Sequence, residues 1–241
     1  MKTNYLNINR YEIINNLIGE KNIGVELGVA EGSFSYQMME SKKFKYFYGI
    51  DSYDMFQHDN NEYIKAKKKL SNFENYKLIR KKFNDSLDDF QDNSLDFIYI
   101  DGFAHEGSDA GKALIQWIKK LKIGGICAGD DYHRKWPLVK MIVDDVVSQL
   151  NLELNITNKK INEKYSEFPS WFFVKKEEKN ITLSKNYEQI ARINKKKEVF
   201  KRSLIGKIIF FNFKYFIYSF SYKILPNNIF NKILTIYKKF F

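Results

Sequence analysis

Residues 23–35 read IGVELGVAEGSFS, and this stretch decides the fold. An apolar run leads into a turn that contains Gly28 and Gly32, and helical spacing begins directly after it. Gly28 permits a tight turn, and Gly32 permits close approach of a ligand to the N-terminus of the helix. The spacing differs from the dinucleotide pattern G-x-G-x-x-G, because Ala30 and Ser33 occupy two of its glycine positions. The stretch therefore predicts a strand, a ligand-binding turn and a helix.

Similar apolar runs alternate with helical segments further along the chain. In the helical segments apolar residues recur at three- and four-residue spacing, as in Leu114, Trp117 and Leu121. This alternation predicts a doubly wound α/β fold with a mostly parallel sheet covered on both faces. The last run, 170–174, is expected at an edge of the sheet. The predicted strands are 23–27, 45–50, 76–80, 95–100, 124–129 and 170–174, and the predicted helices are 33–42, 60–74, 109–121 and 137–150.

The composition divides the chain into two regions. Eleven of the twelve glycines lie between Gly19 and Gly129, whereas the chain after Lys175 is rich in Lys, Asn, Ile and Phe. We therefore expect a ligand-binding domain over residues 1–178 and a basic, aromatic-rich helical extension over residues 179–241.

The extension carries a polar line beside an apolar face. Lys207, Lys214 and Ser221 recur every seven residues, next to Ile and Phe side chains. This many charges argues against a membrane-spanning helix. Two interpretations stay open: the helix binds an anionic membrane surface, or its apolar face packs on the body of the protein or on a second subunit of a homodimer.

The net charge and the cysteine content of the chain limit the binding partners and the cellular location that we expect. The 241 residues include 40 Lys and Arg against 29 Asp and Glu, a formal charge of +11, which favours phosphates, anionic lipids or acidic substrates. No RNA-binding module is recognisable, so nucleic acid is not an expected partner. The single cysteine, Cys127, and a polar N-terminus without a signal-peptide pattern predict a cytoplasmic protein, with peripheral contact at the inner face of the membrane through the extension.

Polar residues follow the predicted strands, where an open parallel sheet binds its ligands. Asp51 follows the second strand and is suited to accept hydrogen bonds from both hydroxyls of a ribose. Asp85 and Ser86 follow the third strand, where they would meet the edge of an adenine. Each could equally cap a helix, and Ser86 has the sequence context of a cap.

The chain carries five motifs in a fixed order: ELGVAEGSFS, YGIDSYD, FNDS, LDFIYIDGFAHEG and LKIGGICAGDDYH. In this order and spacing they resemble class I S-adenosylmethionine-dependent methyltransferases, over about residues 20–175. The motifs are most similar to the branch that includes sugar methyltransferases of bacterial polysaccharide clusters. The resemblance implies S-adenosyl-L-methionine as the cofactor and a seven-stranded Rossmann-like sheet with one antiparallel strand.

The resemblance also assigns contacts to the cofactor. It implies that Glu26 and Gly28 line the methionine portion, that Asp51 binds the ribose, and that Asp85 with Ser86 contacts the adenine. The complete candidate set for cofactor binding is Glu26, Gly28, Gly32, Ser33, Asp51, Ser52, Asp85, Ser86 and Asp101.

Methyl transfer is an in-line displacement, so the acceptor side must align a nucleophile and remove its proton. The three histidines, His58, His105 and His133, each follow a predicted strand. An imidazole suits a hydroxyl acceptor, and we favour His105 as the base, with His133 second and Asp101 as a further catalytic candidate. In the resembled branch the histidine commonly stands three residues after the aspartate, whereas His105 stands four after Asp101. This difference leaves His133 or a metal-bound arrangement as alternatives.

Three carboxylates form a second group on the acceptor side. Asp101 follows the fourth predicted strand, and Asp130 and Asp131 follow the fifth. Three oxygen ligands facing a cleft would suit Mg²⁺ or another divalent cation, which would hold acceptor oxygens and lower the pKa of the one that attacks. The alternative is that Asp101 orients a histidine or lysine, Asp130 caps its loop and Asp131 is solvated.

Two further segments point to the acceptor. Residues 52–63, SYDMFQHDNNEY, have the polar and aromatic character of a flap that closes over a substrate. Residues 132–137, YHRKWP, add two cations and an indole, a pairing that is common in sites for phosphorylated or sugar ligands, although the same residues could be solvated or packed under the next helix.

The expected function is O-methylation of a sugar or sugar-nucleotide in surface polysaccharide biosynthesis, for capsule or lipopolysaccharide. Three alternatives remain. N-methylation of a small amine or amino sugar would need neither metal nor a strong base. In a nicotinamide-dependent sugar oxidoreductase Asp51 would serve the ribose equally well, but the glycine spacing argues against this class. In a non-catalytic membrane-associated module the basic extension would carry the function.

Overall fold

The computed structural model describes residues 2–54, 58–101, 110–162 and 166–202. The elements of these residues are, in chain order, β1 (Lys2–Leu6), the 3-10 helix η1 (Arg10–Asn16), β2 (Asn22–Leu27), α1 (Ser33–Glu40), β3 (Phe44–Asp51), α2 (Asn60–Leu70), β4 (Tyr76–Arg80), the 3-10 helix η2 (Asn84–Asp89), β5 (Leu95–Ile100), α3 (Ala110–Lys120), β6 (Leu121–Gly129), α4 (Pro137–Gln149), β7 (Glu153–Thr157), β8 (Trp171–Val174) and α5 (Lys185–Arg202).

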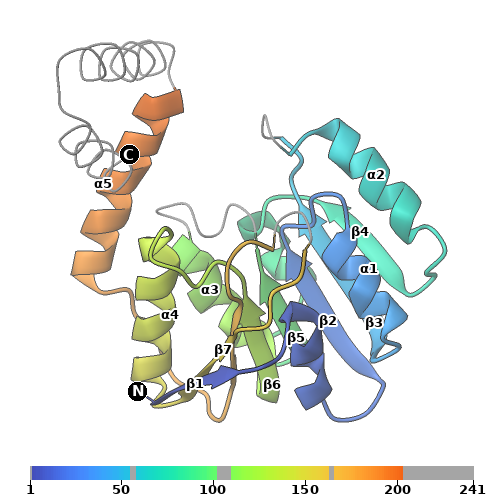
Figure 1. Ribbon diagram of the computed structural model, residues 1–241, viewed down its shortest axis with the longest axis horizontal. Coiled ribbons are helices and arrows are strands. Elements are labelled where there is room, and N and C mark those ends of the chain that lie inside the picture. Colours follow the sequence, from blue (N-terminus) through green and yellow to red (C-terminus); the bar gives the residue numbers. More distant parts are fainter. Residues whose placement is uncertain (1, 55–57, 102–109, 163–165, 203–241) are drawn as a thin grey trace, which may run out of the picture. The chain divides into compact units, whose positions relative to one another are not determined.

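The strands that the structure describes form one eight-stranded sheet in the order β1-β7-β8-β6-β5-β2-β3-β4 (Figure 1). Neighbouring strands run parallel except β8, which is antiparallel to both β6 and β7. The predicted class is confirmed: a doubly wound α/β sheet, mostly parallel, with one antiparallel strand. The difference from the expected seven strands is β1, which adds a parallel strand at the edge beside β7.

The expectation that residues 170–174 form an edge strand is wrong. β8 lies inside the sheet, where Phe172 pairs with Ala128 of β6 and Trp171 pairs with Ile156 of β7. β7 was not predicted from the sequence. It is a five-residue segment with only two apolar residues, Leu154 and Ile156, which gives little apolar signal.

Both faces of the sheet are buried, as in parallel sheets generally. In β5, Ile98 and Ile100 pack into the core cluster that contains the side chains of α3 and α4. Phe97 and Tyr99, which alternate with them, pack into the cluster that contains η1, α1 and α2. The continuous apolar run of β5 therefore follows from burial on two sides.

The chain divides into two compact units, Met1–Arg192 and Ile193–Phe241, and the sheet belongs to the first. Tyr187 and Ala191 of α5 are buried and belong to the core cluster that contains α3 and α4. The expected boundary after residue 178 stays a prediction. The polar line at Lys207, Lys214 and Ser221 lies outside the described residues. Among the described residues no helix is both long enough and apolar enough to cross a membrane.

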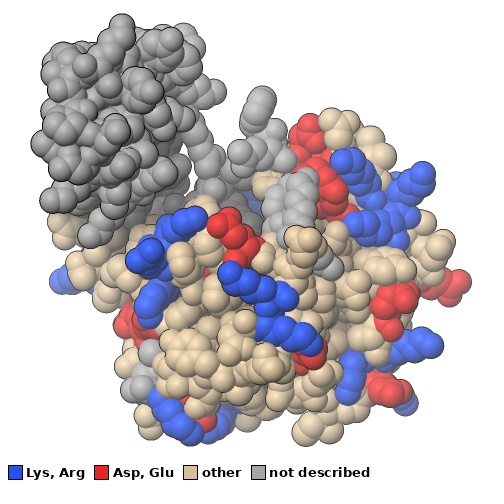
Figure 2. Space-filling model, in the orientation of Figure 1, with Lys and Arg blue, Asp and Glu red and all other residues tan. Residues whose placement is uncertain are grey.

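Basic side chains do not gather into one patch on the face of the described residues that Figure 2 shows. Lys and Arg are interspersed there with Asp and Glu. Several of the exposed cations are paired, as in the ion pairs Lys81–Asp89 at 2.8 Å and Lys135–Glu167 at 3.3 Å.

Candidate active site

The carboxyl ends of the central strands meet at the point where the strand order reverses, between β2 and β5. Backbone hydrogen bonds continue the sheet past the strand ends: Gly28 N donates to Ile50 O at 2.9 Å, and Asp101 N donates to Leu27 O at 2.7 Å. Asp130 N donates to the carbonyl at the end of β5 at 3.1 Å. The residues that follow β2, β3, β5 and β6 therefore lie along one edge, which is where sheets of this kind bind ligands.

The turn after β2 has a left-handed backbone at three positions, with φ of 95° at Gly28, 47° at Ala30 and 78° at Gly32. Gly32 is the N-cap of α1 and makes no side-chain cap bond. A Cβ on Gly32 would lie 2.8 Å from Leu70 Cδ1 and 3.3 Å from Ala66 Cα. Close packing of this turn on α2, together with the positive φ, therefore explains the glycine without reference to a ligand.

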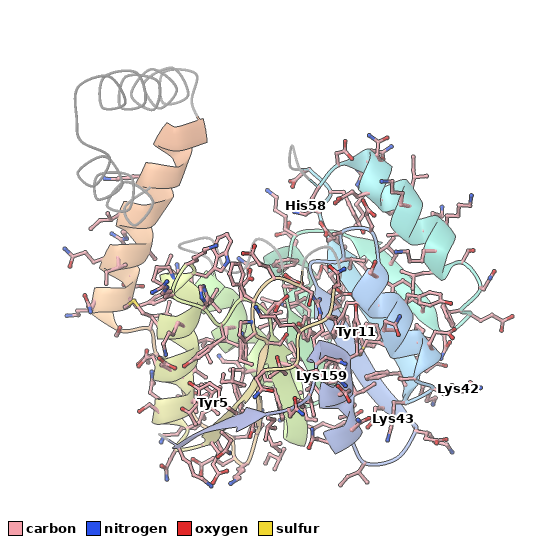
Figure 3. All side chains as sticks on the ribbon, in the orientation of Figure 1. Tyr5, Tyr11, Lys42, Lys43, His58 and Lys159 are labelled. Carbon is pink, nitrogen blue, oxygen red and sulfur yellow. The ribbon has the colours of Figure 1, made fainter. Side chains whose placement is uncertain are left out.

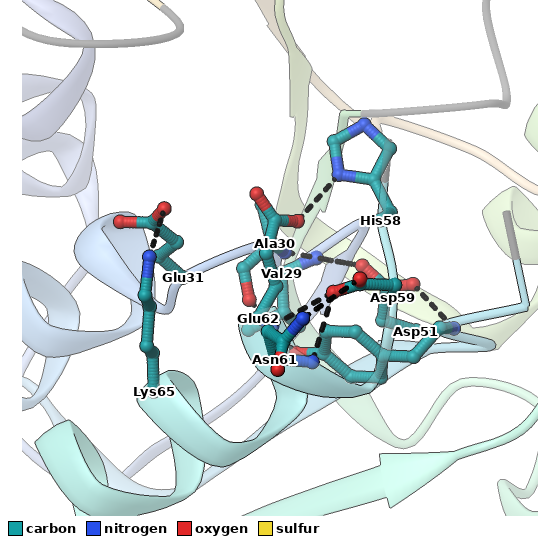
Figure 4. A network of polar contacts seen from close by, with 10 residues as sticks. Val29, Ala30, Glu31, Asp51, His58, Asp59, Asn61, Glu62 and Lys65 are labelled. Carbon is teal, nitrogen blue, oxygen red and sulfur yellow. Dashed lines mark hydrogen bonds and ion pairs between the residues drawn. The ribbon is translucent and has the colours of Figure 1, made fainter. Parts of the chain in front are cut away.

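Asp51 at the end of β3 holds the turn in place (Figure 4). Its Oδ2 accepts hydrogen bonds from Val29 N at 2.9 Å and Ala30 N at 3.1 Å, and its Oδ1 accepts one from Tyr53 N at 3.1 Å. A carboxylate offers about four lone-pair sites, so these contacts leave room for one further donor, such as a ribose hydroxyl. The prediction that Asp51 binds both hydroxyls requires rearrangement of one of the three bonds.

The loop after β3 is held in place by hydrogen bonds, both within the loop and to neighbouring residues. Tyr53 Oη donates to Ala30 O at 3.0 Å, and Ser52 Oγ donates to Asp54 Oδ1 at 2.5 Å. Arg80 Nη2 donates to Tyr53 O at 3.3 Å. The last four residues of the expected flap, 60–63, are helical, because α2 begins at Asn60.

His58 lies at the N-terminal end of α2 (Figure 3). Its Nδ1 lies 2.7 Å from Oε2 of Glu62, which belongs to the first turn of α2 (Figure 4). Asp59 caps the helix by accepting hydrogen bonds from the backbone N–H groups of Asn61 and Glu62. His58 therefore belongs to the local structure that starts α2.

Glu26 of β2 is buried beneath α1, with 1% of its surface exposed. It accepts a hydrogen bond from Ser35 Oγ, which in turn lies 3.1 Å from Tyr76 Oη. Burial raises the pKa of Glu26 well above its usual value, the Ser35 hydrogen bond opposes this, and the charge of Asp101 adds to the rise. Its contact with the methionine portion stays a prediction.

The remaining cofactor candidates differ in exposure. Ser86 lies within η2, is buried, and donates from Oγ to Lys82 O at 3.2 Å. The alternative that Ser86 caps a helix is wrong, because the N-cap of η2 is Phe83. Asp85 is exposed, and Ser33 Oγ accepts a hydrogen bond from Lys69 Nζ at 2.8 Å. Contacts of these residues with the cofactor stay predictions.

The acceptor-side carboxylates of Asp101 and Asp130 share one cation, the guanidinium of Arg10. Arg10 Nη1 lies 2.9 Å from Asp130 Oδ2, and Nη2 lies 3.2 Å from Asp101 Oδ2. Arg10 and Asp130 are 6% and 3% exposed, whereas Asp101 keeps 18% of its side chain accessible. Arg10 was not among the site residues predicted from the sequence; it comes from η1 and lies 91 and 120 residues from its partners.

A divalent cation does not fit this group. Among the described residues, no three His, Cys, Asp or Glu side chains are arranged to hold a metal ion. Asp130 Oδ1 accepts a hydrogen bond from Ser170 Oγ at 3.1 Å, while its Oδ2 binds Arg10. Asp131 has a φ of 62°, and burial together with the charge of Asp130 raises its pKa to about 8. Two members of the expected set, Asp101 and Asp130, are therefore organised around an arginine.

The described part of the acceptor side also contains an aromatic stack. The rings of His133 and Phe168 lie parallel with centroids 4.6 Å apart. Lys135 Nζ lies 5.1 Å from the centroid of Phe168, and Lys135 N donates to His133 Nδ1 at 3.2 Å. His105, the favoured base, lies outside the described residues.

The strand order, the turn after β2 and the acidic side chain after β3 define a class I S-adenosylmethionine-dependent methyltransferase fold. The site fits that cofactor, because the turn opens α1 without a side-chain cap and Asp51 keeps a free lone-pair site beside it.

Comparison with known proteins gives the same class. Residues 25–132 match the sequence profile of a family described as a methyltransferase domain. This match covers less than half of the chain, and the fold is shared with S-adenosylmethionine-dependent methyltransferases. Neither comparison supports the nicotinamide-dependent oxidoreductase or the non-catalytic module. No curated protein sequence gives a significant match.

Solved structures share the fold at low sequence identity. One is a SAM-dependent O-methyltransferase from Thermotoga maritima, with 11% identity and a TM-score of 0.51 over 70% of this chain and 64% of that one. Another is an O-methyltransferase from Bacillus cereus in complex with SAH, with 11% identity and a TM-score of 0.51 over 68% and 79%. A third is a putative rRNA-methylase from Clostridium thermocellum, with 14% identity and a TM-score of 0.53 over 70% and 94%. The alignment thus spans less than two thirds of the Thermotoga maritima protein.

Proposed function

We propose that the protein transfers a methyl group to a hydroxyl of a sugar or sugar-nucleotide in the assembly of a surface polysaccharide, capsule or lipopolysaccharide. The observation that carries the proposal is the position of Asp101. Its backbone N–H bonds to the last residue of β2 at 2.7 Å, so the side chain begins beside the glycine turn, and 18% of it is accessible. A carboxylate beside the cofactor turn suits the orientation of a hydroxyl or of the base that deprotonates it.

The cofactor, when bound, supplies an electrophilic methyl group on a sulfonium. The turn at Gly28 and the carboxylate of Asp51 would hold it, with Glu26 beneath the turn. His105, four residues after Asp101, would take the proton of the acceptor hydroxyl, and His133 is the second candidate for this step.

The aromatic stack supports a sugar-nucleotide as acceptor. An aromatic face packs against the C–H groups of a pyranose or against a base, and a neighbouring cation binds phosphate. The stack of His133 and Phe168, with Lys135 5.1 Å from the ring, offers both features on a partly exposed surface. Two of the solved structures that share this fold are described as O-methyltransferases, which agrees with a hydroxyl acceptor.

The test combines binding and transfer. Calorimetric titration of the full chain with S-adenosylhomocysteine should show binding, and titration with NAD should not. Transfer of labelled methyl from S-adenosylmethionine should then be measured to nucleotide sugars, free sugars, amino sugars and small amines. We expect a methyl ether on a sugar, identified by NMR.

The variants His105→Ala and His133→Ala separate the two candidate bases. We expect His105→Ala to lose transfer while it binds S-adenosylhomocysteine like wild type, because the base does not contact that ligand. Methylation of amines alone, unchanged in His105→Ala, would overturn the proposal in favour of N-methylation.

A further inference from the structure

Arg10 is built into the acceptor side as a buried cation. Its guanidinium bridges Asp101 and Asp130 at 3.2 and 2.9 Å, and its central carbon lies 4.9 Å from the ring centroid of Phe34 and 5.2 Å from that of Tyr99. Arginine stays protonated in proteins, and both aromatic faces and both carboxylates favour the charged form. The site between the two strand ends is therefore permanently occupied by a positive charge.

The partners of Arg10 are themselves fixed. Tyr99 Oη lies 3.0 Å from Ser170 Oγ, which donates to Asp130 Oδ1 at 3.1 Å. The carbonyl of Asp130 accepts a hydrogen bond from Trp171 Nε1 at 3.1 Å. One oxygen of each carboxylate, Oδ2 of Asp101 and Oδ2 of Asp130, already binds Arg10, and a divalent ion held by these two side chains would lie beside a second cation.

The capped start of the 3-10 helix η1 holds Arg10 in position. Asn9 Oδ1 accepts hydrogen bonds from Tyr11 N at 2.8 Å and Glu12 N at 3.2 Å, and Glu12 Oε2 accepts one from Asn9 N at 2.8 Å, a reciprocal capping box. Lys159 Nζ lies 3.4 Å from Glu12 Oε2, and Figure 3 shows Lys159 and Tyr11 in the same region beside η1. The N-terminal helix therefore starts at a fixed place and presents Arg10 to the strand ends.

We propose that Arg10 takes the place of a divalent metal ion on the acceptor side: it is a positioning residue that fixes Asp101 beside the cofactor turn and leaves methyl transfer independent of added metal. The effect on turnover rests on the function proposed above. The exclusion of metal ions from Asp101 and Asp130 does not, because it concerns binding in the protein without acceptor.

Metal binding is tested on the full chain after treatment with a chelator. Mn²⁺ is titrated by electron paramagnetic resonance into wild type, Arg10→Gln and the control Lys81→Gln, which removes a cation from the exposed carboxylate of Asp89. We expect Arg10→Gln to bind Mn²⁺ at least about tenfold more tightly than wild type and Lys81→Gln, because it leaves two carboxylates without their cation. Mn²⁺ binding to wild type that disappears in Asp101→Asn would overturn the inference, even if methyl transfer to a sugar is found.

The positioning role is tested by kinetics. We expect wild-type turnover to be unchanged by chelator, and Arg10→Gln to lower kcat at least about tenfold with affinity for S-adenosylhomocysteine within about twofold of wild type. Arg10→Lys, which keeps the charge but cannot bridge two carboxylates through one planar group, should recover part of kcat. Equal kcat in wild type and Arg10→Gln would overturn the role.

A folding defect is controlled by thermal unfolding of each variant. If Arg10→Gln does not fold, the comparison of Mn²⁺ binding between wild type and Asp101→Asn, and the kcat of Arg10→Lys, decide the inference. Should no acceptor be identified, the Mn²⁺ titrations still confirm or overturn the exclusion of metal.

Discussion

The carboxylate of Asp51 accepts a hydrogen bond from the backbone N–H of Val29 at 2.9 Å, so the candidate ribose ligand also shapes the turn that opens the cofactor site. Two further backbone N–H groups, of Ala30 and Tyr53, bind the same side chain at 3.1 Å. The stability of the turn therefore depends on the same charged group that we propose as the ribose ligand.

Asp51→Asn should weaken both properties. The amide side chain has one acceptor oxygen, so at least one of the three N–H groups would face an amide donor. We expect a loss of ~1–3 kcal/mol in the free energy of unfolding and at least about tenfold weaker binding of S-adenosylhomocysteine. Urea unfolding and calorimetry measure the two effects. Asp54→Asn, in the same loop but exposed, serves as the control and should change neither by much.

Gly32→Ala should destabilise the contact between α1 and α2. The variant combines a positive φ of 78° with a Cβ 3.3 Å from the backbone Cα of Ala66. Gly19 has a similar φ of 74° and nothing within 4 Å of its virtual Cβ, so Gly19→Ala isolates the conformational cost. In urea unfolding we expect Gly19→Ala to lower the free energy of unfolding by about 1 kcal/mol. Gly32→Ala should lower it by ~1–3 kcal/mol more. An equal loss in the free energy of unfolding for the two variants would contradict this prediction. It would show that α2 moves to accommodate the added methyl group without cost.

The parts of the fold with a strong local signal were predictable. β2 to β6 and α1 to α4 follow from apolar runs and helical spacing, because all of them except β4 bury side chains on one or both faces. β1, KTNYL, is an edge strand with only two apolar residues, Tyr5 and Leu6, so its sequence gives no such pattern.

The same limit applies to the site. Asp51, Asp101 and Asp130 could be placed because they directly follow predicted strands whose ends share an edge. Arg10 could not, because its partners are 91 and 120 residues away and nothing local links them. The local signal that was available is the capping box of Asn9 and Glu12, which fixes the start of η1 and hence the position of Arg10.

Asp131 should make the protein less stable as the pH rises. Burial and the charge of Asp130 raise its pKa to about 8 in the folded protein, above that of an unfolded aspartate near 4. Between these values the folded state binds more protons than the unfolded state, so the free energy of unfolding falls with rising pH up to about 8. The penalty is absent below the unfolded pKa and complete above the folded one.

Asp131→Asn isolates this effect. Asparagine tolerates the positive φ of 62° and does not ionise, so the variant should gain stability over wild type, and the gain should increase between pH 5 and pH 8. Urea unfolding of both proteins at several pH values within that range measures it. A difference that is constant with pH would mean that Asp131 keeps an ordinary pKa.

Phe168→Ala should affect the acceptor and not the cofactor. The ring stacks on His133 with centroids 4.6 Å apart and lies 5.1 Å from Lys135 Nζ, so its removal takes away an aromatic face and the support of the imidazole. An aromatic pair contributes ~0.5–1.5 kcal/mol beyond the area it buries, which corresponds to about a two- to tenfold change in binding. We therefore expect KM for a nucleotide-sugar acceptor to rise by about this factor, with binding of S-adenosylhomocysteine unchanged by calorimetry.

Tyr5→Ala, which removes a ring that is 69% exposed on β1, should leave both constants at the wild-type value. An unchanged KM in Phe168→Ala would place the acceptor elsewhere along the strand ends and remove the support that the aromatic stack gives to a sugar-nucleotide.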